Sequence, residues 1–154
     1  MYKQLLSSGE YTFDHMLVIK DPYGEAPLTA LALFILEEPA CVRVTTKGNL
    51  KETDFVTELP KKKEHRVPIL GMYAEKANDI VIEILDDEGN CVKSHTFTIR
   101  TKRLPKSLRN VITVKKWTDK PAYSNIMING GVKIHTCVFD IEGKIGYYLC
   151  LLYT

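Results

Sequence analysis

The segment 80–99 constrains the fold more than any other part of this sequence, because its pattern is that of a β-hairpin. Residues 80–85 are rich in β-branched side chains, and residues 91–99 alternate between a more polar and a less polar face. Residues 86–90 are acidic or small, and they include Gly89, which can adopt the positive φ of a tight turn. The sequence therefore predicts that 80–85 pairs with 91–99.

Short segments of strand-forming residues recur along most of the chain, with Gly, Asn and Pro between them. The apolar run 29–36 lies between Pro27 and Pro39 and is too short for a typical helix, so a strand is predicted. Residues 60–64 are charged and predict a loop, and Pro68 lacks a backbone donor, which predicts a sheet edge. This pattern predicts an all-β fold, an immunoglobulin- or fibronectin-III-like β-sandwich. The other predicted strands are 41–46, 52–59, 65–73, 111–114, 126–128, 132–139 and 144–153.

The length and composition of the chain exclude several classes of protein. A chain of 154 residues, 45% hydrophobic and 26% charged, suits one globular domain or one domain plus part of another. Its longest apolar run, 147–153, is too short to span a membrane. Residues 1–10 contain no apolar signal segment, so the chain is expected to be cytoplasmic as written. If a signal has been removed, it is expected to be periplasmic or extracellular.

The net charge of +2 hides two halves of opposite sign. Residues 1–99 hold 11 basic and 16 acidic side chains, a net charge of −5, whereas residues 100–154 hold 10 and 3, a net charge of +7. The basic stretch could bind phosphate or sulfate groups. No aromatic residue interleaves with the bases before Trp117, so a solvated linker, or a seam that docks on an acidic neighbour, is favoured over such binding. The net charge of +2 is too small to imply nucleic-acid binding. The bases of this stretch are Arg100, Lys102, Arg103, Lys106, Arg109, Lys115, Lys116 and Lys120.

The cysteines and histidines show none of the spacings of a metal or catalytic site. The cysteines are predicted to be buried free thiols, and a disulfide stays open as an alternative if the protein is exported. The sequence also lacks the motifs of common hydrolases, metalloproteases and nucleotide-binding proteins, so no catalytic residue, metal or cofactor is expected. The residues concerned are Cys41, Cys91, Cys137, Cys150, His15, His65, His95 and His135.

Two acidic groups and one tyrosine are predicted to have structural tasks. Asp86–Glu88 is expected to be a turn rather than a calcium loop, because calcium loops alternate ligands with spacers and a hairpin tip is a natural place for solvated acids. Asp140–Gly143, with two alternating acids before a glycine, is also expected to be a turn. Tyr73 lies just before the 80–85 strand, where a sandwich can use a tyrosine hydroxyl to tie a loop to the backbone.

Two longer segments resemble a known family. Residues 21–31, Asp-Pro-Tyr-Gly-Glu-Ala-Pro-Leu-Thr-Ala-Leu, resemble the "N-P-Y-G-x-A-P-L-T-A-L" opening of the N-terminal domain of bacterial arylsulfate sulfotransferases. Residues 64–73 resemble the same domain's "H-x-I-P-I-L-G-L-Y" segment, and residues 78–81 are similar to its "N-x-V" strand start. The matching positions, interpreted as structural, are Pro22, Tyr23, Gly24, Pro27, Leu28, His65, Pro68, Leu70, Gly71 and Tyr73.

The resemblance implies an immunoglobulin-like domain followed by a six-bladed β-propeller. Enzymes of this family move a sulfuryl group from a phenolic sulfate ester to another phenol without the nucleotide donor PAPS, through a covalent intermediate on a propeller histidine. Residues 139–144 resemble the "D-x-x-G-x-x-R-W-Y" start of that propeller, although Gly146 and Tyr147 replace its Arg and Trp. No histidine here matches the catalytic motif. The resemblance thus implies a sandwich at 1–100, a basic connector at 101–121 and the first strands of an incomplete propeller at 122–154.

The leading hypothesis is a non-catalytic N-terminal module that packs on the rest of an arylsulfate sulfotransferase-like protein and helps subunits associate. Its partners would be the missing propeller and a second copy, joined through the unpaired strand edge of residues 144–153. The alternative is a stand-alone immunoglobulin- or fibronectin-III-like module that binds carbohydrate or protein. A third hypothesis is residual sulfotransferase activity. The residues expected at an interface are Trp117, Tyr147, Tyr148, Leu149 and Leu151.

Overall fold

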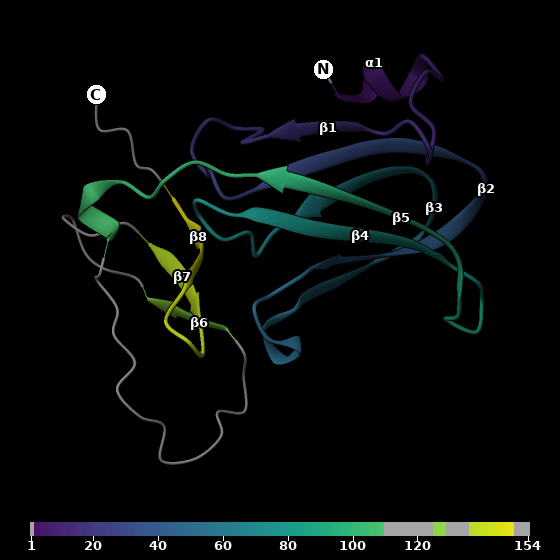
Figure 1. The fold of residues 1–154 in the computed structure, drawn as a ribbon. Coiled ribbons are helices and arrows are strands. Elements are labelled where there is room, and N and C mark those ends of the chain that lie inside the picture. The colour runs from purple at the N-terminus through teal and green to yellow at the C-terminus, as the bar shows by residue number, and fades with distance from the viewer. Residues whose placement is uncertain (1, 110–124, 129–135, 150–154) are drawn as a thin grey trace.

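The computed structural model describes residues 2–109, 125–128 and 136–149 (Figure 1). Several predictions lie outside these residues: the strand 111–114, the first part of the strand 132–139, the end of the strand 144–153, Trp117, Cys150 and Leu151. The described elements are α1 (Tyr2–Ser7), β1 (Leu17–Lys20), β2 (Ala30–Thr46), the 3-10 turn η1 (Lys51–Thr53), β3 (Phe55–Ile69), β4 (Ala77–Leu85), β5 (Cys91–Arg100), η2 (Lys106–Leu108), β6 (Asn125–Ile128), β7 (Cys137–Asp140) and β8 (Ile145–Tyr148).

A long bent hairpin of β2 and β3 organises the sandwich. The first half of β2 pairs with β1 and with the end of β3, and its second half pairs with the start of β3 and with β4. The β2–β3 register shifts twice between Ile35 and Val42, and such irregularities bend a strand. The bend carries β2 from one layer of the sandwich to the other (Figure 1). Two layers therefore share the same two strands.

The bend contradicts two sequence predictions. Residues 29–36 and 41–46 are not separate strands, because β2 continues through Pro39. Residues 60–64 are not a loop, because β3 runs through them, with Glu64 opposite Ile35. The side chains of residues 60–64 are exposed, so their polarity reflects a solvated edge rather than a break in pairing. Pro68 lies in β3, which pairs only with β2 among the described strands, as expected for an edge position.

The predicted 80–99 hairpin is confirmed as β4 and β5, which are antiparallel. Ile80 faces Phe97 and Ile82 faces His95, so the odd-numbered residues of β5 turn toward the core. Gly89 has φ of +85°, and this supplies the positive φ that the turn requires.

The core lies between the two layers of the sandwich. Both halves of β2 send even-numbered side chains into it, and β3, β4 and β5 add the others. The odd-numbered face of the first half of β2 is instead covered by helix α1, where Leu6 is fully buried (Figure 1). This six-residue helix was not predicted. The main core residues are Phe13, Ala30, Ala32, Phe34, Leu36, Val42, Val44, Val67, Ile69, Met72, Ile80, Ile82 and Ile99.

A second antiparallel sheet, ordered β6-β7-β8, follows the sandwich. The Asp140–Gly143 turn that joins β7 to β8 is confirmed, since the Gly143 N–H donates to the Asp140 carbonyl at 2.9 Å. None of the described helices is long and apolar enough to cross a membrane.

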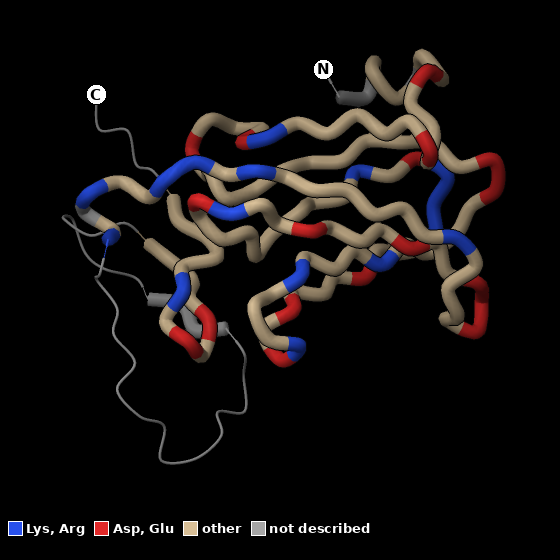
Figure 2. Tube along the Cα trace, viewed as in Figure 1, with Lys and Arg blue, Asp and Glu red and all other residues tan. Residues whose placement is uncertain are grey.

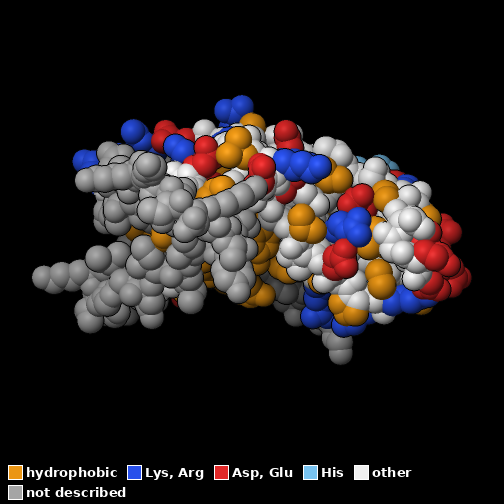
Figure 3. Space-filling view, turned by 90° about the horizontal axis from the view of Figure 1, so that it is seen from below, with side chains coloured by type: hydrophobic (Ala, Val, Ile, Leu, Met, Phe, Trp, Pro, Cys, Tyr) orange, Lys and Arg blue, Asp and Glu red, His pale blue; other side chains and the backbone are white. Residues whose placement is uncertain are grey.

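Charged residues of both signs lie at each end of the sandwich. Figure 2 shows blue tube at the ends of β1 and β5 and on the segment after β5, with red tube close by. At the opposite end red tube marks the bend of β2 and the turn between β4 and β5, and blue tube runs beside it in β3 and at the start of β5. Figure 3 shows acidic side chains clustered at that end, with basic side chains next to them.

Candidate functional site at the contact between the sandwich and the C-terminal strands

The described residues contain no group of three or more His, Cys, Asp or Glu side chains placed to hold a metal ion. Asp86 forms a turn, because its Oδ1 accepts the backbone N–H of Glu88 at 3.0 Å and that of Asn90 at 2.7 Å. The hydrogen bond from the Asn90 backbone is the main cause that lowers the pKa of Asp86. Asp87 is paired with Lys61. The acidic hairpin tip is therefore a turn, as predicted.

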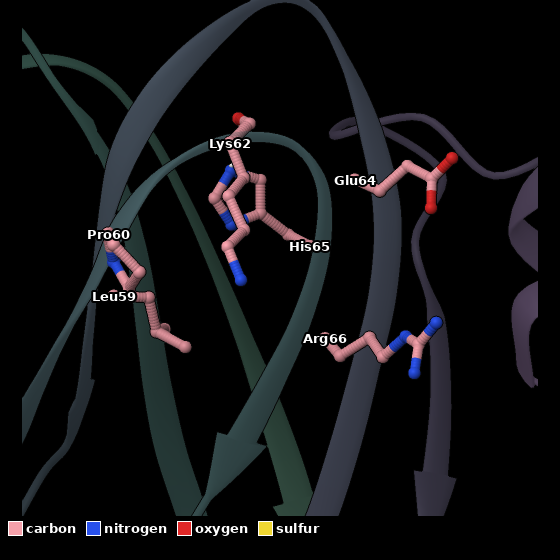
Figure 4. A pocket seen from close by; sticks show the side chains of 6 residues that line it. All are labelled: Leu59, Pro60, Lys62, Glu64, His65 and Arg66. Atoms are coloured by element: carbon pink, nitrogen blue, oxygen red, sulfur yellow. Dashed lines mark hydrogen bonds between the residues drawn. The ribbon is translucent and has the colours of Figure 1, made fainter.

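His65 is a buried structural histidine. Its ring stacks on Phe34 with centroids 5.3 Å apart, and its Nε2 lies 2.8 Å from the Lys62 carbonyl oxygen. Burial lowers the pKa of His65, and the backbone of Lys62 and Ala40 only partly opposes this. The ring lines a hollow of about 390 Å³ inside the bend of β3, where the Glu64 and Arg66 side chains stand apart from it (Figure 4).

The cysteine prediction holds for one residue and fails for another. Cys137 is buried and burial raises its pKa, as expected of a small apolar side chain. Cys91 is exposed, because it opens β5 at the solvent side of the hairpin tip. Cys41 is partly buried. All three are free thiols.

The most developed polar contact joins the sandwich to the C-terminal sheet. The Tyr73 hydroxyl donates to Asp140 Oδ2 at 2.5 Å, and Tyr73 and Asp140 are only 7% and 2% exposed. Asp140 Oδ1 also accepts the backbone N–H groups of Glu142 and Lys144, each at 2.9 Å. Burial, and secondly the bond to Asp140, raise the pKa of Tyr73. One carboxylate thus shapes the β7–β8 turn and ties it to the sandwich.

This contact corrects the prediction for Tyr73. The hydroxyl was expected to bind backbone within the sandwich, but it binds a side chain 67 residues later in the chain. Asp140 was predicted only as part of a turn, and nothing in its local sequence indicates the partner.

Buried Asn78 holds Tyr73 in place through its backbone. Asn78 Oδ1 accepts the Tyr73 N–H at 2.7 Å, and its Nδ2 donates to the Tyr73 carbonyl at 3.0 Å. Nδ2 also reaches the carbonyl of Ile99 at 3.3 Å, at the end of β5. Thr101 Oγ1 donates to the same Tyr73 carbonyl at 2.5 Å. The loop that carries Tyr73 is therefore fixed to both β4 and β5.

Close backbone approach reinforces the contact at Gly71. Gly71 has φ of +78°, and a Cβ added there would lie 2.6 Å from the Phe55 Cβ. A Cβ on Gly146, in β8, would meet the Gly71 Cα at 3.4 Å, so the two glycines pass near each other. Leu70 and Tyr147 line an apolar hollow of about 220 Å³ at this contact.

A small apolar cluster completes the contact, and we call it the C-terminal cluster. It joins Leu28 and Leu108 from the sandwich side to four buried residues of β7 and β8. Leu28 arrives there through the 21–29 turn, in which Asp21 Oδ1 accepts the Ala26 N–H at 2.9 Å. The cluster consists of Leu28, Leu108, Cys137, Phe139, Ile145 and Tyr148, with Ala74 and Leu104 packed against it.

The residues predicted to be structural differ in how they are placed. Four of them have the packing or hydrogen bonds described above: Leu28, His65, Gly71 and Tyr73. Tyr23, in contrast, is 75% exposed and belongs neither to the main core nor to the C-terminal cluster. Gly24 has φ of +76° within the 21–29 turn, and Pro22 and Pro27 flank it. Of the residues predicted at an interface, the structure places Tyr148 in the C-terminal cluster and Tyr147 beside the apolar hollow. The Leu149 N–H donates to the Thr136 carbonyl at 3.0 Å, whereas Trp117 and Leu151 lie outside the described residues.

The fold and this contact define an immunoglobulin-like β-sandwich that carries a further β-sheet on its C-terminal side. A family model described as "Arylsulfotransferase Ig-like domain" matches residues 17–102, which run from the first residue of β1 to two residues beyond β5. Because this match covers more than half of the chain, the protein belongs to the arylsulfotransferase Ig-like domain family. No curated protein matches the chain.

Proposed function

We propose that this chain is the non-catalytic N-terminal module of an arylsulfate sulfotransferase-like protein, and that it holds the start of the following domain in place. The observation that carries the proposal is the buried Tyr73–Asp140 hydrogen bond, surrounded by the C-terminal cluster. A buried charged hydrogen bond is costly to leave half-made, so it fixes the relative position of the two parts it joins. β6, β7 and β8 would then belong to the first blade of a propeller.

The coupling between the two residues tests the proposed packing role. A double-mutant cycle of Tyr73→Phe and Asp140→Ala, measured by urea denaturation, should give a coupling of about 1–3 kcal/mol. The cycle of Tyr73→Phe with Glu142→Ala is the matched control, because Glu142 is an exposed acid in the same turn. Its coupling should stay below about 0.5 kcal/mol. Additive effects in both cycles would contradict the packing role.

An assay of sulfuryl transfer tests the proposal that the chain is non-catalytic. The described histidines are placed as core or surface residues, and His65 is engaged with Lys62 and Phe34. We therefore expect the chain to transfer no sulfuryl group from 4-nitrophenyl sulfate to phenol above the rate in buffer. Turnover that scales with protein concentration would overturn the proposal. In the gene, a reading frame that continues past Thr154 into repeated four-strand segments would support it.

Subunit association forms the second part of the proposed function. Within the described residues β8 pairs only with β7. A strand at the edge of a sheet is a position at which a second copy can add a strand of its own. Light scattering over a concentration series should show a mass above that of the monomer. A monomer at every concentration would refute association and leave the packing role standing.

A further inference from the structure

The two edge strands β1 and β5 run beside each other in the same direction (Figure 1). At one end, Lys93 of β5 contacts the carboxylate of Asp14, with Nζ and Oδ2 2.7 Å apart. At the other end, Lys20 of β1 and Arg100 of β5 line the same hollow. Among the described strands, β1 pairs only with β2 and β5 pairs only with β4. We call the strip that these four residues bound the β1–β5 seam.

The side chains that point into the sandwich from both edges of the seam stay partly exposed. Val18 pairs with the core residue Ala32, and Phe97 pairs with the core residue Ile80, so both lie on the inner face. Because they stand on edge strands, the part of each side chain that remains exposed lies at the seam. Four half-buried side chains occupy this position: Met16, Val18, His95 and Phe97. The edge of the core is thus accessible to solvent along the seam.

Strand β5 is suited to the addition of a further strand. It is ten residues long, it contains no proline or glycine, and from Ser94 to Ile99 it carries no lysine, arginine or acidic side chain. Proline and charge are the features that discourage strand addition at an edge. A strand added beside β5 would place alternate side chains over Val18 and Phe97, and the others beside Thr96 on the outer face.

The two ends of the seam carry opposite charge. The hollow at one end, of about 470 Å³, is lined by three bases and one acid: Lys20, Arg100, Lys102 and Asp21. The hollow at the other end, of about 400 Å³, is lined by three acids and one base: Asp14, Glu37, Glu38 and Lys93. Of these residues only Asp14 and Lys93 take part in an ion pair among the described residues, and they pair with each other. Such ends favour a segment with an acid at one end and a base at the other.

We propose that the β1–β5 seam binds an extended peptide segment of another protein, which adds to the edge of β5 as an antiparallel strand. Antiparallel pairs are the commoner kind. Alternating aliphatic side chains of the segment cover Val18 and Phe97. An acidic side chain at its N-terminal end lies beside Lys20 and Arg100, and a basic side chain at its C-terminal end lies beside Glu38. At about 3.3 Å per residue, about seven to nine residues fill the seam.

The seam uses neither β8 nor the C-terminal cluster, so the proposed function stands even if no peptide binds here. A pair of peptides with the same composition tests the seam. The first is Glu-Glu-Thr-Val-Thr-Val-Thr-Lys-Lys, and the second has the reverse order, so that its lysines come first. Each peptide is added to the ¹⁵N-labelled chain, and amide shifts and amide hydrogen exchange are followed by NMR.

We expect the first peptide to bind saturably and to slow the exchange of alternate amides within residues 93–99. It should bind at least about fivefold more tightly than the reversed peptide. If the reversed peptide binds as tightly, or if neither peptide binds, the proposal is overturned. Slow exchange at 93–99 that appears without peptide as the protein concentration rises would mean that a second copy occupies the seam, and this too would overturn it.

Reversing the charge at both ends of the seam should reverse the preference between the peptides. In the double variant Arg100→Glu, Glu38→Lys, we expect the reversed peptide to bind more tightly than the first. The matched control is Arg103→Glu, Glu88→Lys, which makes the same two changes at residues that line neither hollow. It should keep the original preference within about twofold. The same change of preference in both double variants would mean diffuse attraction and would refute the seam.

The apolar part of the seam is tested by a change that keeps the shape of the side chain. Val18→Thr should weaken binding of the first peptide by about threefold or more, because its hydroxyl is buried under the added strand. Val56→Thr is the control, since Val56 is 52% exposed on β3 and lies outside the seam. Equal affinities in the two variants would show that the core edge does not contact the peptide. Unchanged NMR spectra outside residues 10–35 and 91–103 confirm that Val18→Thr is folded.

Discussion

At the scale of single residues, Gly71 shows how one position can answer two constraints at once. Its positive φ is one that residues with a Cβ rarely adopt, and a Cβ added to it would lie 2.6 Å from the Phe55 Cβ. The resemblance of residues 64–73 to a family motif could mark this glycine as structural. It could not show that Phe55, 16 residues earlier, is the reason that no larger residue fits.

Replacing Gly71 by alanine should therefore destabilise the protein through both constraints. We expect Gly71→Ala to lower the free energy of unfolding in urea by about 2–4 kcal/mol, from backbone strain and from the clash with Phe55. Gly89→Ala provides the control, since Gly89 has a similar φ of +85° but nothing within 4 Å of an added Cβ. It should cost only about 1 kcal/mol. Equal losses would show that the contact with Phe55 does not matter.

Buried His65 makes stability depend on pH below neutrality. Burial holds its folded-state pKa below the ordinary value of about 6.5, so the unfolded chain binds the proton more readily. The stability that neutral His65 contributes is thus fully present above about pH 6.5 and is lost as the pH falls below it. The loss should approach, at most, about 1.4 kcal/mol per pH unit.

The measurement compares urea unfolding at pH 7.5 and 5.5 for the wild type and for His65→Phe. The phenylalanine keeps an aromatic ring beside Phe34 but cannot take up a proton. The difference between the two pH values should therefore be smaller in the variant. If both proteins lose the same stability, then His65 is not the group responsible, and other histidines or carboxylates set the pH dependence.

At the scale of elements, local sequence patterns predicted the pairing of β4 with β5 correctly, but they did not predict that β2 and β3 are long continuous strands. The β4–β5 hairpin is correct because a local turn and alternating side chains determine it. In place of the β2–β3 hairpin, the sequence predicted several shorter strands, because Pro39, Pro60 and the charged residues around them indicate loops. In the structure these residues occupy the bend, where register shifts accommodate the prolines and solvent accommodates the charges. Strand pairing over the whole hairpin outweighs the local preference.

Helix α1 covers one face of the first half of β2, and this role follows from the fold rather than from the local sequence. Its six residues are too few to be stable alone, so its Leu6 must gain stability from Leu31 and Leu33 beneath it. Leu6→Ala should lower the free energy of unfolding by about 2–4 kcal/mol. Leu50→Ala makes the same chemical change at a residue that is 47% exposed and should cost less than about 1 kcal/mol. Thermal or urea unfolding distinguishes these outcomes, and a neutral Leu6→Ala would show that α1 does not cover the sheet in solution.

At the scale of the whole molecule, the sandwich and the C-terminal sheet meet through residues that are far apart in sequence. Composition and motifs predicted a boundary near Arg100, but they could not predict which atoms join the two sides. Tyr73 and Asp140 are 67 residues apart, and Leu28 meets Phe139 and Tyr148 within the C-terminal cluster over a still longer separation. Such contacts depend on the folded path of the chain and have no local signal.

The C-terminal cluster should control how tightly β7 and β8 are held to the sandwich. Leu28→Ala removes an apolar side chain on the sandwich side without changing β7 or β8 themselves. We expect amide hydrogen exchange of Val138 and Tyr147 to accelerate about tenfold or more, because local opening of the C-terminal sheet becomes easier. Exchange of Ile82, in the middle of β4, should change less.

Val56→Ala serves as the comparison, since Val56 is 52% exposed on β3 and lies outside the C-terminal cluster. It should leave the ratio of exchange rates between β8 and β4 unchanged. If Leu28→Ala accelerates exchange equally in β4 and β8, the molecule opens only as one unit and the cluster is an inseparable part of the main core. If it accelerates neither, Leu28 contributes little to the position of the C-terminal sheet, and the Tyr73–Asp140 bond and the close approach of Gly71 and Gly146 hold that sheet instead.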